Sequence, residues 1–90
     1  MNHHYNIIVH GQVQGVSYRV TTKEKADQLG VKGTIQNLPD ETVQIKAEGS
    51  SDQMDHFLAY CHEGSCCAVI DLVQVETGDV IGYEGFDIIE

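Results

Sequence analysis

The stretch GQVQGVSYR, residues 11–19, has the composition of a backbone site for an anion. It lies between a β-branched run and a helix-like pattern, and Gly11 and Gly15 give its backbone unusual freedom. The first N–H groups of a helix have no partner within that helix, so a loop before it can direct several N–H groups toward a phosphoryl group. Arg19, at the expected helix start, could add bidentate hydrogen bonds from its guanidinium group. The segment therefore predicts an anion site, although two glycines before a helix are also typical of a tight turn.

Ordinary explanations exist for each polar residue near this segment. The loop has neither the GxxxxGK[ST] pattern nor the three glycines of a dinucleotide-binding fingerprint. Arg19 could pair on the surface with Glu24, and Asn37, just before Leu-Pro-Asp, is a good turn residue. His10 adjoins the loop and suggests a general base, but a polar residue at a strand end is the favoured interpretation.

A cluster of soft ligands lies later in the chain, at Cys61, His62, Cys66 and Cys67. Adjacent cysteines on a strand cannot easily point at one ion, Cys61 falls on the apolar face of a helix pattern, and no CxxC pair is present. Three cysteines do not describe a disulfide framework, and buried reduced thiols are the simpler expectation. The sequence therefore predicts no metal site and no cofactor.

The first half of the chain predicts a strand followed by an amphipathic helix. Residues 5–10, YNIIVH, form a short apolar run that stops at Gly11. From Tyr18 onward a helix face is predicted, because apolar or small side chains recur at the spacing of helical turns: Tyr18, Thr22, Ala26 and Leu29. Gly30 is a typical residue to end this helix.

Residues 31–37 and 42–48 predict a hairpin, with Leu38–Glu41 as its turn. In the second strand three apolar residues alternate with four polar ones. The apolar residues are Val43, Ile45 and Ala47, and the polar residues are Thr42, Gln44, Lys46 and Glu48. This alternation predicts one buried face and one exposed face, with helices only on the apolar side.

The second half predicts another helix and two strands. Ser50 and Gln53 match a capping box, and the apolar residues that follow have helical spacing: Met54, Phe57, Leu58 and Cys61. Residues 68–76 are strand-like, but the alternation breaks near Asp71 or Leu72, which predicts a bulge. Residues 86–88 predict a short closing strand, and the loop 78–82 before it is expected to be mobile.

The order strand, helix, strand, strand, helix, strand, with a short fifth strand, predicts an α+β, ferredoxin-like split βαβ sandwich (βαββαβ): an antiparallel sheet with two helices on one face. Ninety residues fit a single domain, 1–90.

The start of the chain lacks the pattern of a secretory signal, so a cytoplasmic location is expected. A formal charge of −9 with five basic side chains argues against nucleic acid and membrane as partners.

Three segments resemble the acylphosphatase family. HGQVQGVSYR, residues 10–19, is similar to the family signature, in which a glycine, a V-Q-G-V core and an aromatic residue followed by arginine form a phosphate loop. GTIQNLPDETVQIKAEG, residues 33–49, resembles a second motif, where a strand ends in asparagine before a turn. Residues 86–88 resemble the family's closing strand. The resemblance covers nearly the whole chain, although Thr34 stands where many relatives carry a large aromatic residue.

The resemblance implies a metal-free hydrolase that cleaves acyl phosphates, which are carboxylic-phosphoric mixed anhydrides, to a carboxylate and inorganic phosphate. It implies that Arg19 clamps the phosphoryl group and that Asn37 orients the attacking water. It also implies that the phosphoryl group is held by the backbone amides of Gln12, Val13, Gln14, Gly15, Val16 and Ser17. Phosphoryl transfer through a loose transition state needs mainly positioning and charge stabilisation, which these residue types can supply.

A non-catalytic module of the same fold, binding an anion or a soft metal, is the alternative hypothesis. The polar sheet face with Gln44 and Lys46 lacks the stacking aromatic residues of an RNA-binding sheet. The expected partners are therefore a small acyl phosphate and inorganic phosphate, the latter as product and competitive inhibitor, and a monomer is expected. The sequence does not identify the acyl group, because the predicted site contacts the phosphoryl end.

Overall fold

The computed structural model describes residues 2–13, 18–63 and 69–89, in which helices and strands follow the predicted order. The bounds are β1 His3–Gln12, α1 Tyr18–Leu29, β2 Lys32–Asn37, β3 Val43–Gly49, α2 Ser51–Glu63, β4 Val69–Gly78 and β5 Phe86–Ile89. Neither described helix is long and apolar enough to cross a bilayer.

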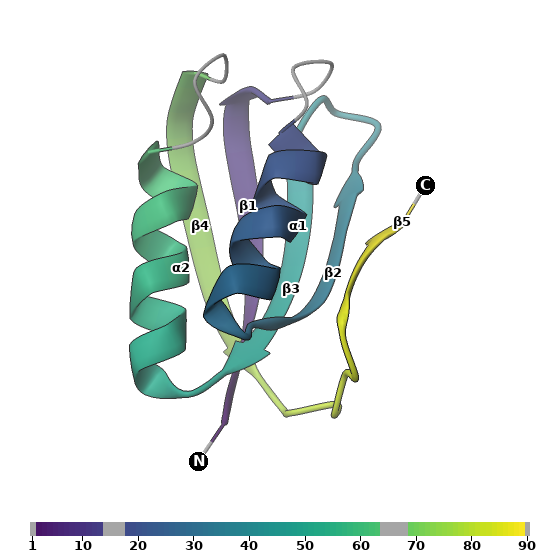
Figure 1. Cartoon of the computed structure of the whole chain (residues 1–90). Coiled ribbons are helices and arrows are strands. Elements are labelled where there is room, and N and C mark those ends of the chain that lie inside the picture. The colour runs from purple at the N-terminus through teal and green to yellow at the C-terminus, as the bar shows by residue number, and fades with distance from the viewer. Residues whose placement is uncertain (1, 14–17, 64–68, 90) are drawn as a thin grey trace.

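The strands form one sheet in the order β4-β1-β3-β2-β5. Strand β3 is antiparallel to both β1 and β2, and β4 is antiparallel to β1. Strand β5 pairs parallel with β2, so the sheet is mixed. Both helices cover the same face (Figure 1). The predicted ferredoxin-like arrangement is confirmed, with β5 as an added parallel strand.

The core lies between this helix-covered face and the two helices. Val43, Ile45 and Ala47 are fully buried there, as their alternation predicts. The helices contribute their predicted faces: Tyr18, Thr22 and Ala26 from α1, and Met54, Phe57 and Cys61 from α2. Each large apolar side chain buried in this way stabilises the fold by about 1.5–3 kcal/mol.

The start of α2 is fixed by the predicted capping box. The Ser50 N–H donates to Gln53 Oε1 at 2.8 Å, and the Gln53 N–H donates to Ser50 Oγ at 3.3 Å. These two bonds satisfy backbone groups that the helix itself leaves unpaired. The prediction of a helix start at this point is confirmed.

The predicted bulge lies at Asp71. His10 pairs with Leu72 and Gly11 pairs with Ile70, which leaves Asp71 without a partner in the register. Gly11 has φ +137°, and a Cβ placed on it would lie 1.9 Å from the carbonyl oxygen of Val69. The first glycine of the loop motif is therefore required by close backbone contact between β1 and β4.

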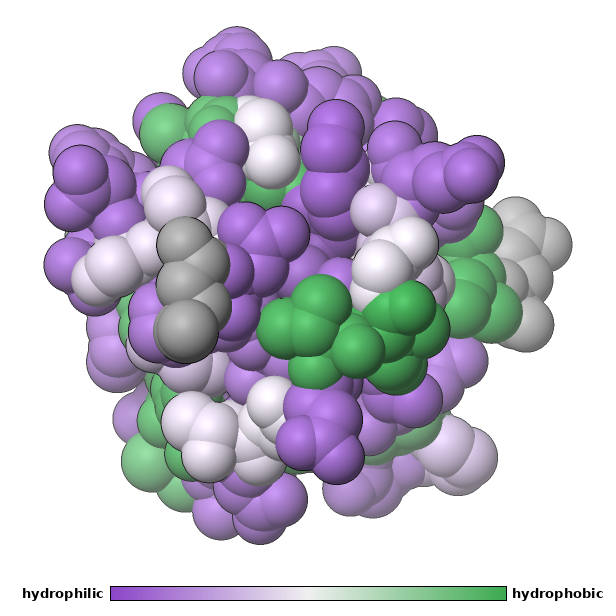
Figure 2. All heavy atoms as spheres, turned by 90° about the horizontal axis from the view of Figure 1, so that it is seen from below, coloured by the Kyte–Doolittle hydropathy of each residue, from purple (hydrophilic) through white to green (hydrophobic). Residues whose placement is uncertain are grey.

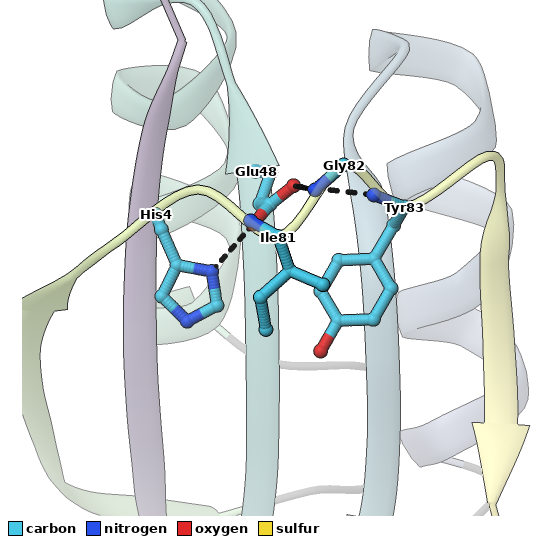
Figure 3. A network of polar contacts seen from close by, with 5 residues as sticks. All are labelled: His4, Glu48, Ile81, Gly82 and Tyr83. Carbon is cyan, nitrogen blue, oxygen red and sulfur yellow. Dashed lines mark hydrogen bonds and ion pairs between the residues drawn. The ribbon is translucent and has the colours of Figure 1, made fainter.

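One prediction is wrong on the face of the sheet that the helices leave uncovered, which is called the open face below. Thr42 and Glu48 were expected to be exposed there, but they are buried, with 5% and 2% of their surfaces accessible. The residues between β4 and β5 cross the end of the sheet beside Glu48 (Figure 3). Figure 2 looks onto this end and shows an apolar patch among mostly hydrophilic side chains. Val80 and Ile81, which lie in the connection between β4 and β5, are exposed.

Glu48 anchors this connection. Its Oε2 accepts a hydrogen bond from the Ile81 N–H at 2.5 Å and lies 2.7 Å from His4 Nδ1. Its Oε1 accepts hydrogen bonds from the N–H groups of Gly82 at 2.9 Å and Tyr83 at 3.3 Å (Figure 3). Burial alone would raise the pKa of this carboxyl group. The donated backbone hydrogen bonds and the His4 contact outweigh burial and lower the pKa below its ordinary value of 4.5. The connection that was expected to be mobile is thus tied to β3.

We expect the Glu48→Gln variant to be less stable by about 2 kcal/mol at pH 7, because an amide replaces an ionised acceptor of several hydrogen bonds. The pKa of Glu48 is lower in the folded protein than in the unfolded chain. The contribution of Glu48 to folding stability is therefore complete above its pKa in the unfolded chain. It is lost as the pH falls below 4.5 and through its lower pKa in the folded protein. Urea denaturation at pH 7 and in acid should show a difference from wild type that shrinks in acid. Glu76→Gln, at an exposed position on β4, is the control; equal losses in both variants would contradict this role.

The Gly11→Ala variant should lose more than about 2 kcal/mol of folding free energy, because it combines a disfavoured φ with a backbone clash. Gly85→Ala is the matched control, since a Cβ at Gly85 meets nothing within 4 Å. Thermal unfolding of both variants measures the effect. Similar melting temperatures for the two would show that β1 and β4 can separate locally at no cost.

Candidate active site

The strand register brings the ends of β1 and β2 together. Val43 of β3 pairs with Val9 of β1 on one side and with Asn37 of β2 on the other. Asn37 therefore lies about 9.5 Å from Val9 across two strand spacings. Strands β1 and β2 finish, and β3 and β4 start, at one end of the sheet, called the site end below; α1 also begins there (Figure 1).

Asn37 presents an unused acceptor at the site end. Along β2 it shares the helix-covered face with Gly33 and Ile35, because side chains two apart point the same way. Its Oδ1 is buried, and no described residue donates a hydrogen bond to it. A buried acceptor without a donor costs about 1–3 kcal/mol, and the Tyr18 hydroxyl at the start of α1 is a second such group among the described residues. A carboxamide oxygen of this kind can accept a hydrogen bond from a water molecule.

The turn that follows holds Asn37 in place. The Leu38 N–H donates to the Thr42 carbonyl oxygen at 2.8 Å, and Asp40 Oδ1 accepts from the Thr42 N–H at 3.2 Å and from the Thr42 hydroxyl at 2.5 Å. The hydrogen bond from the Thr42 hydroxyl, and to a smaller extent the one from the Thr42 N–H, lowers the pKa of the Asp40 carboxyl group. The turn is as predicted. The Asp40 clamp was not predicted, although an aspartate two residues before a threonine is a recognisable turn signal.

Arg19 is the second residue of α1 and is partly exposed. Within the described residues no carboxylate lies within ion-pair distance of it, so the surface pairing with Glu24 is not observed. The preceding residue, Tyr18, is buried and stacks on Tyr60 with ring centroids 6.3 Å apart. The first turn of α1 is thus anchored to α2, while the guanidinium of Arg19 makes no described ion pair.

The predicted phosphate loop is described only at its ends. Gln12 closes β1 opposite Val69, and its side chain is exposed. The side chains of Val13 and Tyr18 are each 1% exposed, so both ends of the loop are anchored in the core. The four residues between them lie outside the described part of the chain, and their predicted roles remain predictions: Gln14, Gly15, Val16 and Ser17.

His10 is not brought to Asn37. Its side chain lies on the open face, where Nε2 is 2.8 Å from Gln74 Oε1 of β4. Asn37 faces the helices, so the sheet separates the two side chains. The interpretation of His10 as a polar strand residue is confirmed.

The described part of the cysteine cluster does not form a ligand set. Cys61 is fully buried and free, as predicted, and burial raises the pKa of its thiol to about 12. A protonated buried thiol is neither a metal ligand nor a nucleophile at neutral pH. In the residues that the structure describes, no three potential ligands come together around one point. Cys66 and Cys67 lie outside those residues.

Comparison with known proteins identifies the family of this chain. The sequence matches the family model described as Acylphosphatase over residues 5–88. It is 41% identical over 83 residues to the acylphosphatase of Haloarcula marismortui, covering 92% of this chain and 91% of that protein. It is 38% identical over 81 residues to the acylphosphatase of Thermus thermophilus, covering 90% and 92%.

A solved structure agrees with the sequence matches. The crystal structure of acylphosphatase from Bacillus subtilis superposes with a TM-score of 0.95 at 31% identity and covers 100% of both chains. The family model, the sequence identity and the shared fold thus all extend over nearly the entire chain. On this evidence the chain belongs to the acylphosphatase family of hydrolases.

Proposed function

We propose that this hydrolase cleaves acyl phosphates without a metal, with backbone amides of residues 12–17 and Arg19 holding the phosphoryl group and Asn37 orienting the attacking water. The observation that carries the proposal is the buried Oδ1 of Asn37, which has no described donor and lies at the site end with the start of α1. Arg19 is on that first helical turn.

In the proposed reaction a water oxygen forms a bond to phosphorus while the bond between phosphorus and the bridging acyl oxygen breaks. The electron pair of that bond leaves with the carboxylate, and the protons of the water pass to the phosphate product and to solvent. A carboxylate is a good leaving group, so no general acid is required. Asn37 accepts a hydrogen bond from the water, and Arg19 stabilises negative charge on the phosphoryl oxygens.

The supporting electrostatics are local rather than global. The whole chain has a formal charge of −9, so its overall field does not attract a phosphoryl dianion. Capture must depend on groups in direct contact with the anion. A guanidinium without a described carboxylate partner and the N-terminal end of α1 are groups of that kind.

The proposal also includes a cytoplasmic location and a monomeric state. The free thiol of Cys61 is compatible with a reducing compartment. The large negative charge disfavours self-association at low ionic strength.

We expect Arg19→Ala and Asn37→Ala each to lower kcat/KM for benzoyl phosphate by about 10²–10³-fold, the usual cost of removing one preorganised contact to the transition state. The assay is release of benzoate in the presence of a chelator. Lys25→Ala, which removes another cation of α1, is the matched control and should retain wild-type activity. Hydrolysis that survives both site substitutions in folded protein, or that the chelator abolishes, would reject the mechanism.

Inorganic phosphate should bind at the same place as the substrate. We expect titration with phosphate to shift backbone amide resonances of residues 11–19 and the side-chain resonances of Asn37, and to inhibit hydrolysis competitively. Arg19→Ala should weaken both effects equally, since both report the binding of phosphate at one site. Stoichiometric, thiol-dependent zinc binding without hydrolysis would instead support the alternative of a soft-metal module.

A further inference from the structure

We propose that Glu48 is a positioning residue for hydrolysis: by clamping the connection between β4 and β5, residues 79–85, it holds β5 against β2 and so fixes Asn37 at the far end of β2. Glu48 lies near the end of β3, opposite the site end, so it does not contact a substrate held there. The inference rests on the proposed function, because it assumes that Asn37 orients the attacking water.

The connection between β4 and β5 crosses the whole width of the sheet. The two strands are the outer ones in the order β4-β1-β3-β2-β5, so four strand spacings, or about 19 Å, separate them. The chain from Gly78 to Phe86 reaches about 26–29 Å when it is fully extended. About 8 Å of slack therefore remains, and a contact near the middle of the connection removes it.

Glu48 makes that contact from β3, the middle strand of the sheet. Its carboxylate accepts hydrogen bonds from the backbone N–H groups of residues 81–83, at the midpoint of the connection (Figure 3). His4 of β1 completes the clamp, because its Nδ1 lies 2.7 Å from Glu48 Oε2 and its ring stacks on Tyr83 with centroids 6.4 Å apart. Both Glu48 and His4 are buried, so water competes little for these hydrogen bonds.

Strand β5 is short, and few contacts determine its place. It has four residues, and among the described strands only β2 pairs with it. The Gly33 N–H of β2 donates to the Gly85 carbonyl oxygen at 2.9 Å, just before β5 begins. Phe86 is buried and packs edge-on against Phe57 at 6.0 Å. The clamp acts directly before these contacts, so it determines where the chain enters β5.

The pairing of β5 with β2 extends to the residue before Asn37. The register runs from Gly33 opposite Phe86 to Gln36 opposite Ile89 (Figure 1). Without β5, β2 would be an edge strand whose last residues could fray. The side chain of Asn37 would then lose its fixed orientation, and catalysis by a positioned water depends on that orientation.

The contacts to the phosphoryl group should not depend on the clamp. Strand β5 contacts α1 as well as β2. The first turn of α1, however, is anchored to α2 by the stacking of Tyr18 on Tyr60. Loosening of β5 should therefore lower kcat and leave phosphate binding unchanged, which distinguishes positioning of the water from a general loss of structure.

Two substitutions disturb the clamp from its two sides. Glu48→Gln removes the ionised acceptor. Gly82→Ala strains the connection, since Gly82 has φ +93° and a Cβ there meets nothing within 4 Å. We expect each to lower kcat for benzoyl phosphate by about tenfold, part of the ~10²-fold that a 1 Å misplacement can cost, with unchanged KM and unchanged inhibition by inorganic phosphate. Gly85→Ala adds the same methyl group to the connection where φ is not positive, and this control should keep the wild-type kcat.

A double-mutant cycle with Asn37→Ala tests whether Glu48 acts through Asn37, in variants that circular dichroism shows to be folded. Glu48→Gln should lower kcat no further once residue 37 is alanine. An equal loss in both backgrounds, or a wild-type kcat in both Glu48→Gln and Gly82→Ala, would overturn the inference while the proposed function stands. A wild-type kcat in Asn37→Ala would instead refute the proposed function itself.

Discussion

Strand β3 hydrogen-bonds to β1 along one side and to β2 along the other, and both pairings are antiparallel. Two strands separated by a helix in the sequence therefore run in the same direction and finish at the same end of the sheet. The start of α1 and the end of β2, where Asn37 lies, are at the same end of the sheet only because of this pairing (Figure 1). A slip of β2 by one residue would also turn Asn37 to the open face, because neighbouring side chains on a strand point to opposite sides.

The two ends of the sheet have different roles. At the site end, Asn37 has a buried oxygen without a described donor, and Arg19 has no described carboxylate partner. At the opposite end, Glu48 uses both carboxylate oxygens to hold the connection between β4 and β5 (Figure 3). Both carboxylate oxygens of Glu48 are engaged in hydrogen bonds, whereas Asn37 Oδ1, which is proposed for chemistry, keeps capacity for a ligand.

The charge distribution suits recognition at short range. An enzyme with a formal charge of −9 attracts no anion from a distance, so the proposed site depends on backbone dipoles and one guanidinium in contact with the phosphoryl group. Such contacts act at short range, so the proposed binding of the phosphoryl end does not depend on the overall field of the protein.

Local sequence signals determined most of the fold. The spacing of Tyr18, Thr22 and Ala26 predicted the buried face of α1, the Ser50 and Gln53 pair predicted the start of α2, and the broken alternation predicted the bulge at Asp71. The motifs that contain Arg19 and Asn37 were also recognisable, because both resemble those of the acylphosphatase family. These features depend on neighbours within a few residues, which the sequence displays directly.

Tertiary structure decided what depends on distant partners. Glu48 alternates with buried residues as an exposed side chain would, but contacts with His4 and with residues 81–83, each more than thirty residues away, make it a buried anchor. The buried Oδ1 of Asn37 without a described donor, and the absence of a described carboxylate partner for Arg19, likewise appear only in the folded structure. The physical reason is that burial and hydrogen-bond satisfaction belong to the space around a side chain, and that space is filled by segments whose approach no local pattern encodes.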